Sequence, residues 1–169
     1  MDSALLTLKI NYRYKDSSGT VGIEARKFSN SFTGTTFTWD SAAASGAYSD
    51  TVSGSLLQII SPQDSILRLR IDTTLIRQWT QLNTGSLILL PTGNTVTGFS
   101  PLNAPTDTRP ELRVYFRKND SLQTRDSLSL RMGSGIFVAD GGPPTNPGTI
   151  TLQAGVAYRG VLRFDSLNI

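Results

Sequence analysis

The sequence predicts an all-β fold, a jelly-roll-like β-sandwich of roughly ten strands with one short helix near residues 73–80. Many short segments alternate apolar with polar residues, which is the pattern of a strand that buries one face. Turn residues, chiefly glycine and proline, separate these segments at close spacing. One segment, 73–80, instead carries apolar residues three and four positions apart, as an amphipathic helix does.

The central stretch, 65–90, combines a strand, a short helix, a loop and a second strand. Alternation over 67–72 predicts the first strand, and Asp72 or Thr73 can cap the helix that follows. The apolar run 87–90 is uninterrupted and is followed by a proline, which suits a strand covered on both faces. We expect the helix to plug one edge or end of the sandwich. Its apolar face consists of Leu75, Ile76 and Trp79.

The residues before this stretch predict strands and one long loop. Residues 3–14 alternate cleanly and predict a long strand, and 21–28 return as the second strand of a hairpin or as a near neighbour. Residues 30–40 are rich in threonine and aromatic residues, which strands favour. The small and polar residues 41–55 predict a long surface loop, and a short strand follows at 56–60.

The residues after the central stretch predict further strands and two loops. A loop crossing at 92–110 is indicated by its prolines and glycines, and the Gly- and Pro-rich segment 141–148 cannot be helical. Residues 119–131 are polar with scattered leucines, and no element is predicted for them. The strands predicted in this part are 111–116, 136–138, 149–153 and 158–165.

Composition bounds the core and excludes several chemistries. With 38% apolar content, residues 1–169 suffice for a single sandwich domain with one core. The absence of cysteine and histidine excludes thiolate and imidazole metal sites, Ser-His-Asp triads and Cys-His dyads. No apolar run of eighteen residues occurs, so no membrane span is expected. The net charge of +3 comes from scattered basic residues, which gives no expectation of nucleic-acid binding.

Several segments together resemble one known family. The order SALLTLKI, TTFTWD, LRLRIDTTLIRQW, NTGSLILLP and RPELRVYF, within residues 1–118, is similar to the later part of the DNRLRE domain, an extracellular β-sandwich module of bacteria. Residues 134–169 contain FVADGGPPTNPGTITLQAG and YRGVLRFDSLNI, which resemble the strands that open the family domain but here come last. The resemblance implies that the chain is part of a secreted or cell-surface protein of a bacterium. Its implied role there is that of a structural spacer or a carbohydrate-binding appendage.

Two explanations of this strand order are open. Either the chain spans the boundary between two related repeats, or it is a circular permutant whose last strand folds back into its own sandwich. A sandwich without its opening strand exposes an edge and an apolar slot. The strand at 158–165 can fill that slot in its own molecule or in a second copy, as a donated strand. The assembly residues of this strand are Tyr158, Leu162 and Phe164.

Arginines on the polar phase of several strands are the first candidate set for ligand binding. If those strands are adjacent, the guanidinium groups form a ladder suited to the carboxylates or sulfates of an acidic polysaccharide. The alternative is an ordinary solvated face with cross-strand pairs to Asp72, Glu111 and Asp165. The candidate set comprises Arg68, Arg70, Arg113, Arg117, Arg159 and Arg163.

Aromatic side chains are the second candidate set, because an aromatic ring can stack on the apolar face of a sugar. Tyr12, Tyr14 and Tyr48 are the surface candidates. Trp39 and Trp79 are instead expected in the core, because each is in phase with apolar neighbours.

Acidic residues in loops are the third candidate set. Asp40, Asp50, Asp107 and Asp140 can hold Ca²⁺ together with backbone carbonyls, and Asp40 and Asp140 are singled out. None of them has the alternating acidic spacing of a dedicated calcium loop. No other cofactor is expected. A glycosidase needs two carboxylates across a cleft, and no spacing in this chain marks such a pair.

The sequence therefore predicts a non-catalytic extracellular β-sandwich module, structural or carbohydrate-binding, of a bacterial secreted or cell-surface protein. The first alternative is a self-assembling fibre or surface-layer subunit joined by C-terminal strand donation. The second is a polysaccharide-degrading enzyme. The expected partners are a polysaccharide, or neighbouring copies or domains of the same protein.

Overall fold

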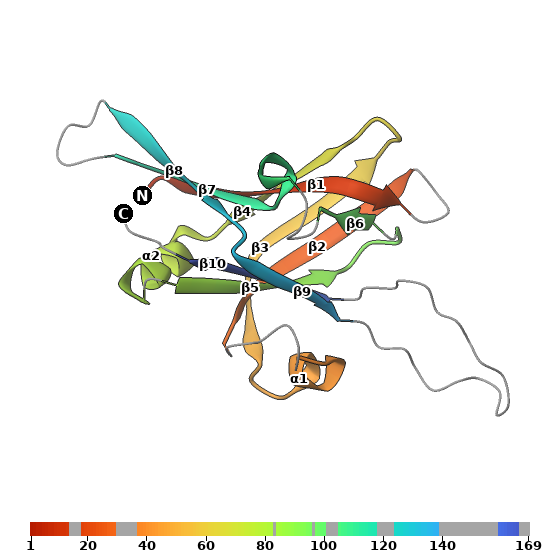
Figure 1. Ribbon diagram of the computed structural model, residues 1–169, viewed down its shortest axis with the longest axis horizontal. Coiled ribbons are helices and arrows are strands. Elements are labelled where there is room, and N and C mark those ends of the chain that lie inside the picture. The colour runs from red at the N-terminus through yellow and green to blue at the C-terminus, as the bar shows by residue number, and fades with distance from the viewer. Residues whose placement is uncertain are drawn as a thin grey trace, which may run out of the picture.

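Two antiparallel β-sheets pack face to face around a shared apolar core (Figure 1). The predicted class, an all-β sandwich with a short helix after Asp72, is confirmed. The computed structural model describes residues 1–13, 18–29, 37–82, 84–95, 97–100, 105–117, 124–138 and 159–165.

Sheet I has the strand order β4 (Ile66–Ile71), β1 (Ser3–Arg13), β7 (Glu111–Arg117) and β8 (Arg125–Arg131), with β6 (Thr97–Phe99) pairing to the end of β1. Sheet II has the order β3 (Tyr48–Ile60), β2 (Gly19–Phe28), β5 (Thr84–Pro91), β10 (Arg159–Asp165) and β9 (Ser134–Val138). The described helices are α1 (Trp39–Ala43), α2 (Thr73–Leu82) and a single 3-10 turn at Thr106–Thr108.

The inner faces of the two sheets follow the period of two that the sequence predicts. In β1, Leu6 and Leu8 are fully buried, whereas the alternate residues Leu5 and Thr7 face the other way and stay partly exposed. The same alternation holds in β4 and β7. The core residues of the strands in both sheets include Leu67, Leu69, Leu112, Val114, Val21, Ile23, Leu87 and Leu89.

Strand β5 is covered on both of its faces, as its uninterrupted apolar run predicts. Leu87 and Leu89 enter the core between the sheets. Ile88 points the opposite way and joins a smaller apolar cluster with Phe28 and Ala42, which α1 helps to cover. The sandwich therefore has a satellite cluster on the outer face of sheet II in addition to its main core.

Helix α2 closes one end of the sandwich, as predicted (Figure 1). The Asp72 carboxylate accepts a hydrogen bond of 2.8 Å from the Thr74 N–H and so caps the helix. Ile76 and Trp79 are buried in the main core, which confirms the prediction for Trp79. The indole ring lies directly against Gly85 of β5, because a Cβ at that glycine would come within 2.1 Å of the ring.

The two sheets approach each other where β3 passes β4. The Asp72 N–H donates a 2.7 Å hydrogen bond to the Ser53 carbonyl. Gly54 lies so close to the Arg70 carbonyl oxygen that a Cβ there would be 2.3 Å from it. This edge of the sandwich is thus closed by backbone contact between the sheets, and glycine is required at the point of closest approach.

Several predictions for individual segments were wrong. Residues 41–55 were expected to form a surface loop, but they contain the end of α1 and more than half of β3. Strand β2 does not pair with β1; it lies in the other sheet, between β3 and β5. The loop predicted at 92–110 contains β6 and the 3-10 turn. The polar segment 119–131, for which no element was predicted, contains β8. The predicted strand at 149–153 lies outside the described residues.

Candidate functional site

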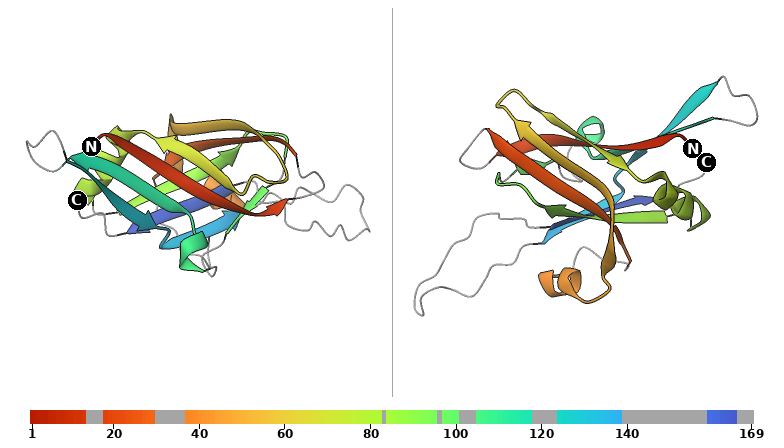
Figure 2. Two further views of the ribbon diagram at one scale, coloured as in Figure 1. Left: turned by 90° about the horizontal axis from the view of Figure 1, so that it is seen from above. Right: turned by 180° about the vertical axis from the view of Figure 1, so that it is seen from behind.

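The strands of sheet I lie side by side in the left view of Figure 2. The outer face of this sheet carries most of the predicted arginines. The inner positions of β4 and β7 are buried, so Arg68, Arg70, Arg113 and Arg117 lie on the opposite, outer face. They do not form a continuous ladder, because β1 separates β4 from β7. In the register, Leu5 lies between Arg70 and Arg113.

Arg159 and Arg163 do not belong to this face. Both lie on β10, which is part of sheet II. Their side chains lie outside the described part of the structure. The predicted set of six arginines is therefore divided between the two sheets, with four on sheet I.

Three further basic residues join the four arginines. Lys9 continues the outer face of β1, and Arg131 and Arg125 lie on β8 opposite Glu111 and Arg117 of β7. The β8 arginines were missed because no strand was predicted there, although they are six positions apart in an alternating segment, RDSLSLR. We name this surface the basic face, with the cations Lys9, Arg68, Arg70, Arg113, Arg117, Arg125 and Arg131.

Glu111 holds two cations of the basic face. Its carboxylate accepts hydrogen bonds from the Arg113 guanidinium at 2.8 and 3.0 Å and from the Ser129 hydroxyl, and it lies 3.1 Å from Arg131. Glu111 does pair across strands, but with Arg131, which was not among the predicted arginines; Arg113, which was, lies on the same strand as Glu111. Asp72 instead caps α2, and the side chain of Asp165 lies outside the described residues.

The hydrogen-bond donors around Glu111 shift its pKa. Burial of this side chain, which is 13% exposed, raises the pKa, but the bonds from Ser129 and Arg113 and the charges of Arg131 and Arg113 outweigh that effect. The pKa of Glu111 therefore lies below its ordinary value. The pKa of Arg113 is raised, chiefly by its hydrogen bond to Glu111 and then by a bond to Tyr115. Both shifts favour the charged forms of Glu111 and Arg113 at neutral pH.

Asp2 holds two other cations at the start of β1. Its carboxylate lies 3.4 Å from Nε of Arg117 and 3.9 Å from Nε of Arg125. The Arg125 guanidinium also covers the ring of Tyr115 at 4.7 Å from the ring centre. We name Arg113, Arg117, Arg125 and Arg131, with their anions Asp2 and Glu111, the paired half of the basic face.

The other half of the basic face carries no such anions. Arg68 and Arg70 are exposed, and within the described part of the chain no carboxylate lies within ion-pair distance of either, or of Lys9. Arg68 and Arg70 are two positions apart on one strand, which places them about 7 Å from each other along it. We name Lys9, Arg68 and Arg70 the unpaired half.

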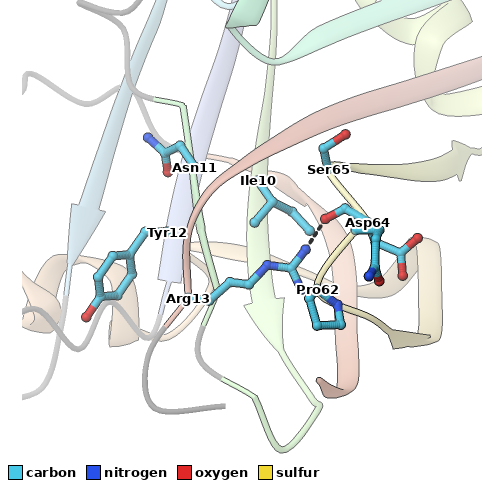
Figure 3. A pocket seen from close by; sticks show the side chains of 8 residues that line it. Ile10, Asn11, Tyr12, Arg13, Pro62, Asp64 and Ser65 are labelled. Atoms are coloured by element: carbon cyan, nitrogen blue, oxygen red, sulfur yellow. Dashed lines mark hydrogen bonds between the residues drawn. The ribbon is translucent and has the colours of Figure 1, made fainter. Parts of the chain in front are cut away.

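A shallow pocket of about 300 Å³ lies where β1 ends beside the turn between β3 and β4 (Figure 3). Arg13 donates hydrogen bonds to the carbonyls of Ser61, at 2.8 Å, and Asp64. The Asp64 carboxylate accepts hydrogen bonds from the N–H and from the hydroxyl of Ser61. Both bonds lower the pKa of Asp64, and the bond from the N–H has the larger effect. These groups hold the turn, and Tyr12 is directed away from them (Figure 3). The pocket therefore does not assemble a ligand site around Tyr12.

The predicted surface tyrosines have different environments. Tyr12 is 51% exposed, because the regular pairing of β1 is interrupted between Ile10 and Tyr12 where β6 takes over. Tyr48 is partly buried and packs in the satellite cluster beside α1. Tyr14 lies outside the described residues, as does the side chain of Trp39.

The predicted calcium residues do not come together among the described residues. Asp40 lies in the first turn of α1, Asp50 is exposed on β3, and Asp107 lies in the 3-10 turn. Within the described ranges, no group of three or more Asp, Glu, His or Cys side chains could hold a metal ion. Asp140 lies outside those ranges, so a calcium site that includes it stays a prediction.

Strand β10, the predicted assembly strand, pairs within its own chain. It is antiparallel to β5 from Gly160 opposite Leu89 to Asp165 opposite Thr84, and β9 pairs along its other edge. The side chains of Leu162 and Phe164 and all of Tyr158 lie outside the described residues. Strand donation to a second copy stays a prediction, and mass measured over a range of concentrations, with and without residues 154–169, would test it.

The fold and this surface define a class of protein, an all-β sandwich with a basic outer face on one sheet. Comparison with known proteins found no matching family model, no matching curated protein and no matching solved structure. None of the described helices is long and apolar enough to cross a membrane.

Proposed function

We propose that this chain is a non-catalytic β-sandwich module that binds an acidic polysaccharide through the unpaired half of its basic face. One observation carries the proposal: Arg68 and Arg70 are exposed side by side and have no carboxylate partner among the described residues. Guanidinium groups bind carboxylates and sulfates through paired hydrogen bonds, which suits a polymer that repeats such groups.

The surroundings of the two arginines support a flat, extended ligand. Leu5 and Thr7 of β1 lie beside Arg70 and Arg68 in the register and are partly exposed on the same face. They provide apolar surface next to the cations, and Lys9 extends the positive charge along β1. A surface of this kind fits the ring faces and the charged groups of a sugar chain. The extracellular, bacterial setting rests on the resemblance to the DNRLRE domain.

Binding to polygalacturonate and dextran sulfate, with neutral dextran as the uncharged reference, tests the proposal. The double variant Arg68→Ala with Arg70→Ala should weaken binding to either charged polymer by roughly tenfold or more, because two charged hydrogen-bond donors are lost. Added salt should weaken binding by the intact chain, since exposed charges are screened over about 10 Å at 0.1 M salt.

Arg117→Ala with Arg125→Ala is the matched control, because it removes the same charge from the same sheet at side chains that Asp2 already holds. The control should change affinity much less than the first pair. If both double variants lost the same affinity, binding would depend only on the net charge of the chain, and this would contradict the proposed site. Release of reducing ends from the polymers would contradict the non-catalytic assignment.

A further inference from the structure

The paired half of the basic face contains a complete carboxylate-binding arrangement. Arg113 presents two N–H groups to one oxygen of Glu111, and the Ser129 hydroxyl donates to the same oxygen. Arg131 approaches the other oxygen at 3.1 Å. Two guanidinium groups and a hydroxyl around one carboxylate are the contacts that a carboxylate ligand would receive. Here the chain's own Glu111 receives them.

We propose that Glu111 is an internal competitor that sets the specificity of the basic face, by filling a carboxylate site of Arg113, Arg131 and Ser129 in place of a ligand. The inference rests on the proposed function. It means that an acidic polysaccharide is confined to the unpaired half in the intact chain. Loss of the Glu111 charge opens a second set of contacts.

The register of sheet I gives the geometry of this extension. Glu111 and Arg68 both lie opposite Thr7, and Arg113 and Arg70 both lie opposite Leu5. The two halves of the basic face are therefore two strand spacings apart, which is about 10 Å. Without the Glu111 charge, a polymer lying on β1 meets cations on both of its sides. In the intact chain the same polymer meets a carboxylate beside Thr7.

The variant Glu111→Gln tests the inference, with Glu24→Gln as its matched control. Glu24 is also a β-strand carboxylate held by one arginine, Arg26, at 2.9 Å, but it belongs to sheet II. Both variants remove one negative charge; Glu111→Gln removes the partner of two arginines and Glu24→Gln the partner of one. Glu111→Gln should bind polygalacturonate about three- to tenfold more tightly than the intact chain, the size expected of two half-exposed ion pairs. Glu24→Gln should leave the affinity within twofold.

A second substitution separates the freed arginines from a change in net charge. Adding Arg131→Ala to Glu111→Gln should remove most of the gain, whereas Arg131→Ala alone should change affinity little, because Glu111 already occupies that guanidinium. In the intact chain, the side-chain N–H resonances of Arg68 and Arg70 should shift with added polymer and those of Arg113 should not. This readout does not depend on the stability of any variant.

The outcomes distinguish the inference from the proposed function. If the intact chain binds through Arg68 and Arg70 but Glu111→Gln has unchanged affinity, the inference is overturned and the proposed function stands. If neither the intact chain nor Glu111→Gln binds, both are overturned. A gain in Glu111→Gln that Arg131→Ala does not remove also overturns the inference, and so does an early shift of the Arg113 resonance.

Discussion

The contact between Trp79 and Gly85 supports a stability prediction that can be worked out from the structure. Trp79 is 1% exposed and anchors α2 in the main core. Its replacement by alanine leaves a large cavity, and we expect the free energy of unfolding to fall by about 3–5 kcal/mol. For a domain of this size that loss corresponds to a drop in Tm of about 6–20 °C.

Gly85 provides a second perturbation of the same contact. A Cβ at this position would lie 2.1–2.6 Å from three atoms of the Trp79 ring, so Gly85→Ala alone should cost about 1–3 kcal/mol through overpacking. In a chain that already carries Trp79→Ala, the added methyl group enters vacated space. The cost of Gly85→Ala should then fall close to zero, which gives a coupling of about 1–3 kcal/mol between the two sites.

Urea unfolding followed by far-ultraviolet circular dichroism measures all four members of this cycle, because one of the two tryptophans is removed and fluorescence is not comparable. Leu82→Ala is the control on the same helix, since that side chain is 63% exposed and should change stability by less than about 0.5 kcal/mol. Additive losses for Trp79→Ala and Gly85→Ala would refute the contact. A loss below about 1 kcal/mol for Trp79→Ala would refute the placement of α2 in the core.

Two further predictions concern single carboxylates. Asp72→Ala removes the side chain that accepts a hydrogen bond from the Thr74 N–H, so it should lower the free energy of unfolding by about 1 kcal/mol. Asp72→Asn should cost less, because the amide oxygen can still accept that hydrogen bond. Thermal unfolding of both variants tests this. The pKa of Glu111 lies below its ordinary value of 4.5, so its contribution to stability is present above pH 4.5 and is lost as the pH falls through the folded value. The stability difference between the intact chain and Glu111→Gln should therefore be largest near neutral pH and vanish in acid, and a difference that persists in acid would contradict the role of the charge.

The parts of the fold that sequence reasoning predicted are those with strong apolar periodicity. The alternation of Leu67, Leu69 and Ile71 and the helical spacing of Ile76 and Trp79 both correspond to buried faces. The first part of β3, residues 48–55, was missed because it lies at the edge of sheet II and exposes the adjacent side chains Asp50, Thr51 and Val52 without a regular alternation. A strand that buries little apolar surface leaves no period of two in the sequence.

For the candidate site, the sequence predicted that arginines of β4 and β7 are exposed, but it did not predict which strands are neighbours or which ion pairs form. Arg68, Arg70 and Arg113 were placed correctly on the polar phase of their strands, because phase depends only on local alternation. Which strands are neighbours depends on long-range pairing, and β1 between β4 and β7 could not be read from spacing. The ion pairs of Glu111 with Arg113 and Arg131 involve three positions on two paired strands. They could be recognised only once the alignment of β7 with β8 was known.

The pairing of β10 with β5 has a consequence for synthesis on the ribosome. The paired residues are 71 positions apart at Leu89 and Gly160 and 81 positions apart at Thr84 and Asp165. At about 5–20 residues per second, β5 leaves the ribosome roughly 4–16 seconds before its partner strand does. During that interval its open edge and the apolar face around Leu87 have no neighbour from β10 or β9. Translation speed through residues 92–158 thus sets how long a nascent chain is open to pairing with the wrong strand, including β10 of an earlier copy on the same messenger RNA.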